Sequence, residues 1–358
     1  MNQRLPLILF VTVILMGSGC GTYRHQPLAP ARAAEVELAS VHRPFALSLE
    51  TKKAILALDP DRVSERDVRE VLSQAPAPRI VNLHGGIATV ICRMVSFSEF
   101  LIGMGYPAAS LTNPADGTYS FSCYESSEKI AGVIAWYYER EGLRPMLTGH
   151  SQGAMQTVKV LHKLAGLSAN RLHVWNPLTW KEEDRCDIVD PLTGERRPVV
   201  GLTLSYATVV GAGGLTRLLP NQWDMWTKLH EIPDSVEEFT GFCKTKDLLG
   251  GDYLGYGSVN EYKSMGKAQV RSVWLPSSYK HGAIPDTKHL LQSKAMVDWI
   301  NQYHPSDKPV DRPQLDREFE GDSRHILWAA EVWYCIKKHW VLELQRWIRE
   351  TDSQGGHA

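Results

Sequence analysis

The segment Gly149-His150-Ser151-Gln152-Gly153 constrains this chain more than any other feature of its sequence. It follows a strand-like run, residues 144–148 (RPMLT), and precedes residues 153–164, whose apolar side chains recur at helical spacing. A sharp turn between a strand and a helix crowds the backbone, so small residues are needed two positions before and two positions after its centre. Glycine occupies both positions here. We therefore expect Ser151 to be exposed at the tip of a strand–turn–helix unit, as a nucleophile.

A second glycine motif, Leu83-His84-Gly85-Gly86, ends another strand-like run that begins at residue 79. A serine hydroxyl is a weak nucleophile at neutral pH, and it needs a base, a group that orients the base, and donors for the developing oxyanion. Glycines let backbone amides face a substrate without an intervening side chain. We expect the oxyanion donors to be the amide of Gln152 and that of either Gly86 or Ile87.

From residue 79 onward, short apolar runs alternate with helical patterns, which is typical of a βαβ sheet protein. The strand-like runs are residues 79–83, 108–111, 144–148, 171–175, 239–245 and 269–275, and the helical patterns are residues 90–104, 126–142, 153–164, 294–302 and 324–349. The last helical pattern is amphipathic and carries four tryptophans, which we expect to pack in the core.

The two glycine motifs, in this order and at strand ends, resemble those of the α/β-hydrolase superfamily, and its lipase and esterase members in particular. The resemblance covers roughly residues 79–302. It implies an α/β fold with a mostly parallel sheet, helices on both faces and a cap insertion. It also implies that the catalytic residues follow one another in the order serine, acid, histidine.

The resemblance places the base in a loop after the last strand, where His281 and Gly282 follow residues 269–275. His289, at the start of the next helical pattern, is a competing position, and His304 lies farther along the chain. We expect His281 to be the base.

The acid should follow the preceding strand-like run, residues 239–245. Asp247 lies directly at its end, Asp252 lies in the same loop, and Asp224 lies in the insertion. We expect Asp247 to be the acid, with Asp252 and Asp224 as alternatives. The role of the acid is to fix the tautomer of the histidine and to stabilise its imidazolium form.

Between about residues 178 and 235 the alternation breaks, and we interpret this stretch as the cap insertion. Its first half is polar and its second half is rich in apolar residues, among them Trp223 and Trp226. A cap of this composition can exclude water and bind an acyl chain or an aromatic group. We expect Trp223 and Trp226 to contact a moderately apolar, lipid-like ester.

The N-terminus has the pattern of an export signal. Arg4 precedes an apolar run, residues 5–16, and small residues then lead to Cys20. The end of this segment resembles the bacterial lipobox, in which the cysteine becomes lipid-modified, although Gly17 stands where that motif usually carries Leu. We expect a signal peptide in residues 1–20, a tether in residues 21–40, the hydrolase domain in residues 41–350, and a lipid anchor in the bacterial cell envelope. A plain cleaved signal and a retained anchor are the alternatives.

Charge and cysteine spacing narrow the functions further. The formal net charge is -1, which gives no electrostatic argument for nucleic acid. Five cysteines remain after Cys20, and none stands at Cys-x-x-Cys spacing, so we expect no zinc site of that type. We also expect the proposed chemistry to use no cofactor. The sequence favours a serine ester hydrolase. An acyltransferase or amidase with the same triad, or a non-catalytic envelope lipoprotein on this fold, are the other hypotheses.

Overall fold

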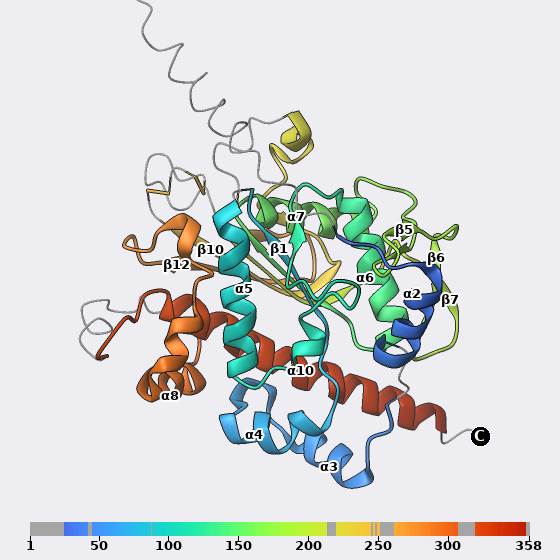
Figure 1. The fold of residues 1–358 in the computed structure, drawn as a ribbon, viewed down its shortest axis with the longest axis horizontal. Coiled ribbons are helices and arrows are strands. Elements are labelled where there is room, and N and C mark those ends of the chain that lie inside the picture. The colour runs from blue at the N-terminus through green and yellow to red at the C-terminus, as the bar shows by residue number, and fades with distance from the viewer. Residues whose placement is uncertain are drawn as a thin grey trace, which may run out of the picture.

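A six-stranded parallel sheet forms the centre of the computed structural model (Figure 1). The described residues are 25–41, 45–86, 88–212, 220–244, 246–247, 249–250, 261–306 and 319–355. The strands are β1 (Ile80–His84), β2 (Phe121–Ser122), β3 (Met146–His150), β8 (Leu204–Val210), β10 (Val236–Lys244) and β12 (Gln269–Leu275), in the spatial order β12-β10-β8-β3-β1-β2. All neighbouring pairs are parallel, which confirms the predicted α/β class.

Helices cover both faces of this sheet. The helices are α2 (Pro30–Val36), α3 (Leu49–Ala57), α4 (Glu65–Glu70), α5 (Ala88–Gly103), α6 (Ser127–Glu141), α7 (Gln152–Leu164), α8 (Lys294–Gln302) and α10 (Ile326–Gly355). One core joins α3, α4, α5, α8 and α10 on one face, and a second joins α6 and α7 on the other. Residues of β1 alternate between the two cores, because successive side chains of a strand point to opposite faces.

The long helix α10 crosses one face of the sheet (Figure 1). Three of its four tryptophans, Trp328, Trp333 and Trp340, are fully buried, and Trp347 packs against the same core. The prediction that these residues serve packing is therefore confirmed for this helix. Among the helices of the described residues, none combines the length and apolarity that crossing a bilayer requires.

The predicted insertion contains a central strand, which corrects its boundaries. Residues 204–210 form β8, which lies between β3 and β10 and is buried along its whole length. The predicted strand at residues 171–175 is instead a coil leading into β4 (Trp175–Asn176), which pairs antiparallel with β5 (Lys181–Glu182) outside the central sheet. The apolar residues of RLHVW favour a strand, whereas the polar Ser and Thr and the nearby glycines weaken the strand signal of LSYATVV.

Short additional strands lie outside the central sheet. The small strands are β6 (Asp187–Val189), β7 (Arg196–Pro198), β9 (Glu231–Ile232) and β11 (Lys263–Ser264).

The strand predicted at residues 108–111 is a 3₁₀ turn, η4 (Ala108–Ser110), and the edge strand β2 was not predicted. Pro107 and the small side chains after it favour a tight turn over an extended strand.

The predicted tether is also partly incorrect, because residues 25–41 pack on the domain. The amide of Leu28 donates to the carbonyl of Leu178, and α2 buries Ala33. The His25 imidazole is 5 % exposed, bonds to the Asp116 carboxylate at 3.1 Å and lies against aromatic rings. Residues 1–24, which include the expected signal peptide and Cys20, lie outside the described residues.

Candidate active site

The strand order reverses at one point of the sheet, between β1 and β3. The chain passes from β1 outward to the edge strand β2, and then returns to β3 on the other side of β1. Loops that leave β1 and β3 therefore run to opposite faces, to α5 and α7, and a crevice opens between them. His84-Gly85-Gly86 follows β1 and Ser151 follows β3, so both glycine motifs meet at this switch point.

Ser151 has the strained backbone that a sharp strand-to-helix turn requires. Its φ is 55° and its ψ is -119°, which is rare for a residue with a side chain and costs about 1–3 kcal/mol. The amide of Ser151 donates to the carbonyl of Val210 at 2.9 Å, which fastens the turn to the end of β8. The strain is sustained by the surrounding sheet, and it presents the hydroxyl above the strand ends.

The two flanking glycines are required by close backbone approaches. A Cβ on Gly149 would lie 2.7 Å from the Cα of Ala154. A Cβ on Gly153 would lie 2.7 Å from the carbonyl carbon of Leu83 and 2.8 Å from the carbonyl oxygen of His84. These distances are well inside ordinary contact. Glycine at 149 therefore lets α7 start close against β3, and glycine at 153 lets α7 approach β1.

Three side chains form a continuous hydrogen-bonded chain at this turn. The Nε2 of His281 lies 2.9 Å from the Oγ of Ser151, and its Nδ1 lies 2.8 Å from the Oδ2 of Asp247. A carboxylate only accepts, so Nδ1 carries the proton and Nε2 is left to accept from the serine hydroxyl. The structure thus brings together the three residues that the sequence selected for nucleophile, base and acid.

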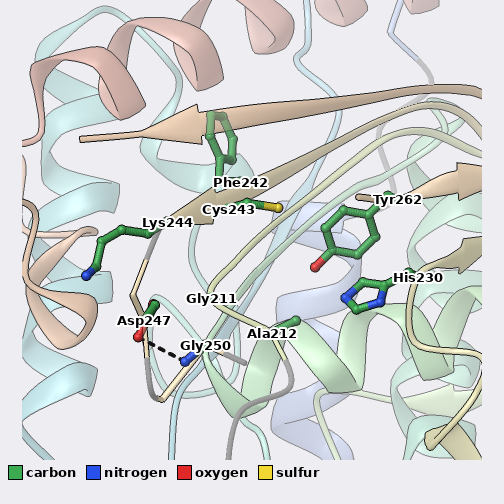
Figure 2. A pocket seen from close by; sticks show the side chains of 9 residues that line it. All are labelled: Gly211, Ala212, His230, Phe242, Cys243, Lys244, Asp247, Gly250 and Tyr262. Atoms are coloured by element: carbon green, nitrogen blue, oxygen red, sulfur yellow. Dashed lines mark hydrogen bonds between the residues drawn. The ribbon is translucent and has the colours of Figure 1, made fainter. Parts of the chain in front are cut away.

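Hydrogen bonds and the charge of His281 keep Asp247 ionised despite its burial. Its side chain is 5 % exposed, and burial alone would raise the pKa of its carboxyl group. The hydrogen bond and charge of His281 outweigh that effect, with help from the amide of Gly250, which donates at 2.9 Å (Figure 2). The pKa of Asp247 therefore lies below its usual value, and the carboxylate remains available to orient and stabilise an imidazolium.

A cavity adjoins Asp247 at the ends of β8 and β10 (Figure 2). Its lining consists of Gly211, Ala212, His230, Phe242, Cys243, Lys244, Asp247, Gly250 and Tyr262. Gly211 has a φ of 67°, and a Cβ there would lie 2.6 Å from the Cε1 of His281. Glycine at the end of β8 therefore leaves room for the imidazole between the serine and the carboxylate.

The glycine loop after β1 lies directly against the serine. A Cβ on Gly85 would lie 3.0 Å from the Cβ of Ser151. The Tyr124 hydroxyl donates to the carbonyl of Gly86 at 3.0 Å, and the Gln152 side chain lies beside the same glycine. Gln152 is the first residue of α7, where helix amides have no partner within the helix. Ile87, the alternative oxyanion donor, lies outside the described residues.

The competing histidines and acids have other partners or fall outside the description. His289 bonds to the carbonyl of Arg324 at 3.2 Å, and His304 bonds to that of Gln302 at 2.8 Å. Asp224 pairs with Lys159 at 3.2 Å on the surface of α7. Asp252 lies outside the described residues.

The two tryptophans expected to contact substrate lie on the surface. Trp223 is 62 % exposed and Trp226 is 49 % exposed, in and just after the 3₁₀ helix η6 (Pro220–Met225). Neither lines the cavity beside Asp247. In Figure 1 this yellow helix projects from the same end of the molecule as the start of α5. Their expected role as substrate contacts stays a prediction.

A larger cavity, of about 490 Å³, lies at the opposite edge of the sheet, where β10 and β12 begin. Several of its charged side chains already pair within the fold. Glu238 bonds to Lys338 at 2.8 Å and to His339 at 3.2 Å. No nucleophile is oriented there by a base among the described residues, so the site at Ser151 is the stronger candidate for catalysis.

Comparisons with known proteins add little to this geometry. No family model matches the chain, and no curated protein sequence matches it. A solved structure described as "RedJ with PEG molecule bound in the active site" aligns with 71% of this chain and 95% of its own, at 14% identity and a TM-score of 0.29. Sheet topology and side-chain geometry therefore define the class: an α/β protein with a hydrogen-bonded Ser–His–Asp set at its switch point.

Proposed function

We propose that the protein is a serine hydrolase of the α/β-hydrolase type that cleaves carboxylic esters through an acyl-enzyme on Ser151. One observation carries the proposal: the unbroken hydrogen-bonded chain from Asp247 through His281 to a serine held at positive φ. A structural tight turn would need neither the histidine nor the carboxylate. Here the histidine bonds to the hydroxyl and the carboxylate bonds to the histidine, at the point where an α/β sheet binds its ligands.

In the proposed reaction, the Oγ of Ser151 attacks the acyl carbon while the Nε2 of His281 accepts the hydroxyl proton. The resulting imidazolium is stabilised by the Asp247 carboxylate. It then gives its proton to the departing alcohol as the carbon–oxygen bond of the ester breaks. Water repeats the sequence on the acyl-enzyme, and the products are a carboxylic acid and the free serine.

The oxyanion of each tetrahedral intermediate needs donors that are already in place. The amide of Gln152 meets this need at the start of α7, and the Gly85–Gly86 turn adjoins it from the other side. The second donor would be Gly86 or Ile87. Removing one such donor typically costs about 10²–10³-fold in kcat, so this loop carries much of the expected rate.

The acyl group that we propose is apolar and lipid-like. The exposed tryptophans Trp223 and Trp226 and the half-exposed ring of Tyr124, which bonds to the glycine loop, support an apolar acyl group over a highly charged one. Hydrolysis of p-nitrophenyl esters of increasing acyl length tests this directly. We expect turnover by the wild type and none above background by Ser151→Ala. Absence of turnover across the whole series in folded wild-type protein would contradict the proposal.

The location that we propose is the bacterial cell envelope, with Cys20 as the lipid-modified residue. The signal-like residues 1–20 support this location, and the packed segment that starts at His25 would then keep the domain close to the bilayer. Metabolic labelling with a clickable fatty acid should mark the wild type and not Cys20→Ser. Labelling that persists in Cys20→Ser would contradict the anchor.

A further inference from the structure

The residue immediately before the nucleophile is bonded to the main chain of the base. The Nε2 of His150, the last residue of β3, lies 2.8 Å from the carbonyl oxygen of His281, and the two imidazole rings are 5.3 Å apart. His150 is 1 % exposed. The same side chain adjoins the glycine loop, since a Cβ on Gly85 would lie 3.2 Å from its Nδ1. His150 thus contacts the loop that carries His281 and also adjoins the glycine loop after β1.

Resting on the hydrolase function proposed above, we propose that His150 is a positioning residue, which holds the backbone of His281 at the distance from Ser151 that proton transfer requires. The carbonyl oxygen can only accept, so the Nε2 of His150 carries the proton. The loop it holds is short: His281 begins η8 (His281–Ala283), a single 3₁₀ turn. A bond to the carbonyl of His281 itself fixes the backbone position from which the catalytic imidazole extends.

Anchors from another element hold the other side of this loop. The Arg93 guanidinium, on α5, donates to the carbonyl of Gly282, and the Ser96 hydroxyl donates to the Asp286 carboxylate at 2.7 Å. His150 supplies the bond on the side of the nucleophile. Without it, no bond from the side of the nucleophile would remain on the carbonyl of His281, and a shift of about 1 Å in a reacting group can cost about 10²-fold in rate.

Charge explains why a neutral donor suits this position. Burial, and next the neighbouring His281, lower the pKa of His150 to about 3, so it stays uncharged while His281 becomes an imidazolium. A lysine or arginine here would repel that imidazolium. A neutral imidazole holds the loop and leaves the proton transfer between Ser151 and His281 undisturbed.

The chain offers a matched control in His162 on α7. It is also 1 % exposed, and its Nε2 also bonds to a backbone carbonyl, that of Glu231, at 2.8 Å. Burial likewise lowers the pKa of His162. Replacing either histidine removes the same kind of buried hydrogen bond, but only His150 bonds to the catalytic loop. Any excess effect on turnover in His150 variants therefore reports positioning rather than stability.

The test compares His150→Phe, His150→Gln and His162→Phe in the whole protein, by kcat and KM on p-nitrophenyl butyrate and by thermal unfolding. We expect His150→Phe to lose about 10–100-fold in kcat with KM changed less than about twofold, because the loss falls on proton transfer. His150→Gln keeps a donor and should recover most of kcat. His162→Phe should match His150→Phe in melting temperature while keeping wild-type kcat.

Equal kcat in His150→Phe and His162→Phe would overturn the positioning role, as would a failure of His150→Gln to exceed His150→Phe. If His150→Phe does not fold, His150→Met serves in its place, since its flexible side chain fills the site without a donor. The proposed hydrolase function fails separately, if the wild type itself does not turn over. A wild type that is active beside an equally active His150→Phe would overturn the inference alone.

Discussion

Gly153→Ala is the sharpest structural perturbation that the site offers. The new methyl group would meet the backbone of β1, at 2.7 Å from the carbonyl carbon of Leu83 and 2.8 Å from the carbonyl oxygen of His84. Favourable separation between carbon atoms is about 3.5–4.0 Å, so α7 and β1 would have to part by roughly 0.8 Å or more. Strand β1 is held between β2 and β3 and cannot retreat alone.

Two opposing effects set the magnitude. Alanine in a helix is favoured over glycine by about 1 kcal/mol. Overpacking against rigid backbone costs about 1–3 kcal/mol or more, and the displacement reaches the serine turn and the glycine loop together. We expect a net destabilisation of about 1–2 kcal/mol in urea unfolding, and about a 100-fold loss of kcat, because both oxyanion loop and nucleophile move.

Gly103→Ala provides the control for this variant. It also adds a methyl group to a helical glycine, but the nearest atoms belong to the Leu291 side chain, with Cδ2 at 2.9 Å, and that side chain can rotate away. We expect Gly103→Ala to keep wild-type turnover and to stay within about 1 kcal/mol of wild-type stability. The reasoning would be refuted if Gly153→Ala matched Gly103→Ala in both measurements.

Three further predictions concern the acid, the glycine loop and pH. Asp247→Asn should lower kcat by roughly 10³–10⁴-fold through loss of the correct histidine tautomer, whereas Asp224→Asn, at an exposed ion pair, should change it little; comparable kcat values would reassign the acid. Tyr124→Phe removes the hydroxyl that bonds to the Gly86 carbonyl, and should lower kcat by about 3–10-fold with the fold intact, as judged by circular dichroism. His150 binds fewer protons in the folded protein than in the unfolded chain between pH 6.5 and about 3, so its contribution to stability is complete above pH 6.5 and is lost as the pH falls through that window. Urea unfolding of His150→Gln should therefore depend less steeply on acid pH than that of the wild type, and parallel slopes would contradict this.

Local sequence patterns were sufficient to predict an element where its conformation depends on nearby residues alone. The glycines around Ser151 predict a turn because only a hydrogen atom fits there, against α7 at Gly149 and against β1 at Gly153, and the structure places that turn between β3 and α7. Residues 269–275 and 294–302 have the boundaries that their patterns predict, since apolar periodicity sets both ends.

Elements decided by tertiary contacts escaped prediction. Strand β8 is extended because β3 and β10 pair with it on both sides, and the hydroxyl groups of its one serine and one threonine are buried and hydrogen-bonded to backbone carbonyls. The N-terminal segment has the composition of a tether, but contacts with distant parts of the chain hold it to the domain. His25 bonds to Asp116, the amide of Leu28 donates to the carbonyl of Leu178, and Glu37 pairs with Arg140. His150 carried no signal of its own, since the motif leaves its second position open and its partner, His281, lies far along the chain.

The central claim is that Ser151 is a nucleophile activated by His281. The most direct measurement is intact-mass and peptide mapping of the protein after reaction with a fluorophosphonate probe. We expect one adduct per chain on Ser151 in the wild type, slowed by orders of magnitude in His281→Ala and absent in Ser151→Ala. No adduct on folded wild-type protein, or equal labelling of the wild type and Ser151→Ala, would contradict the account.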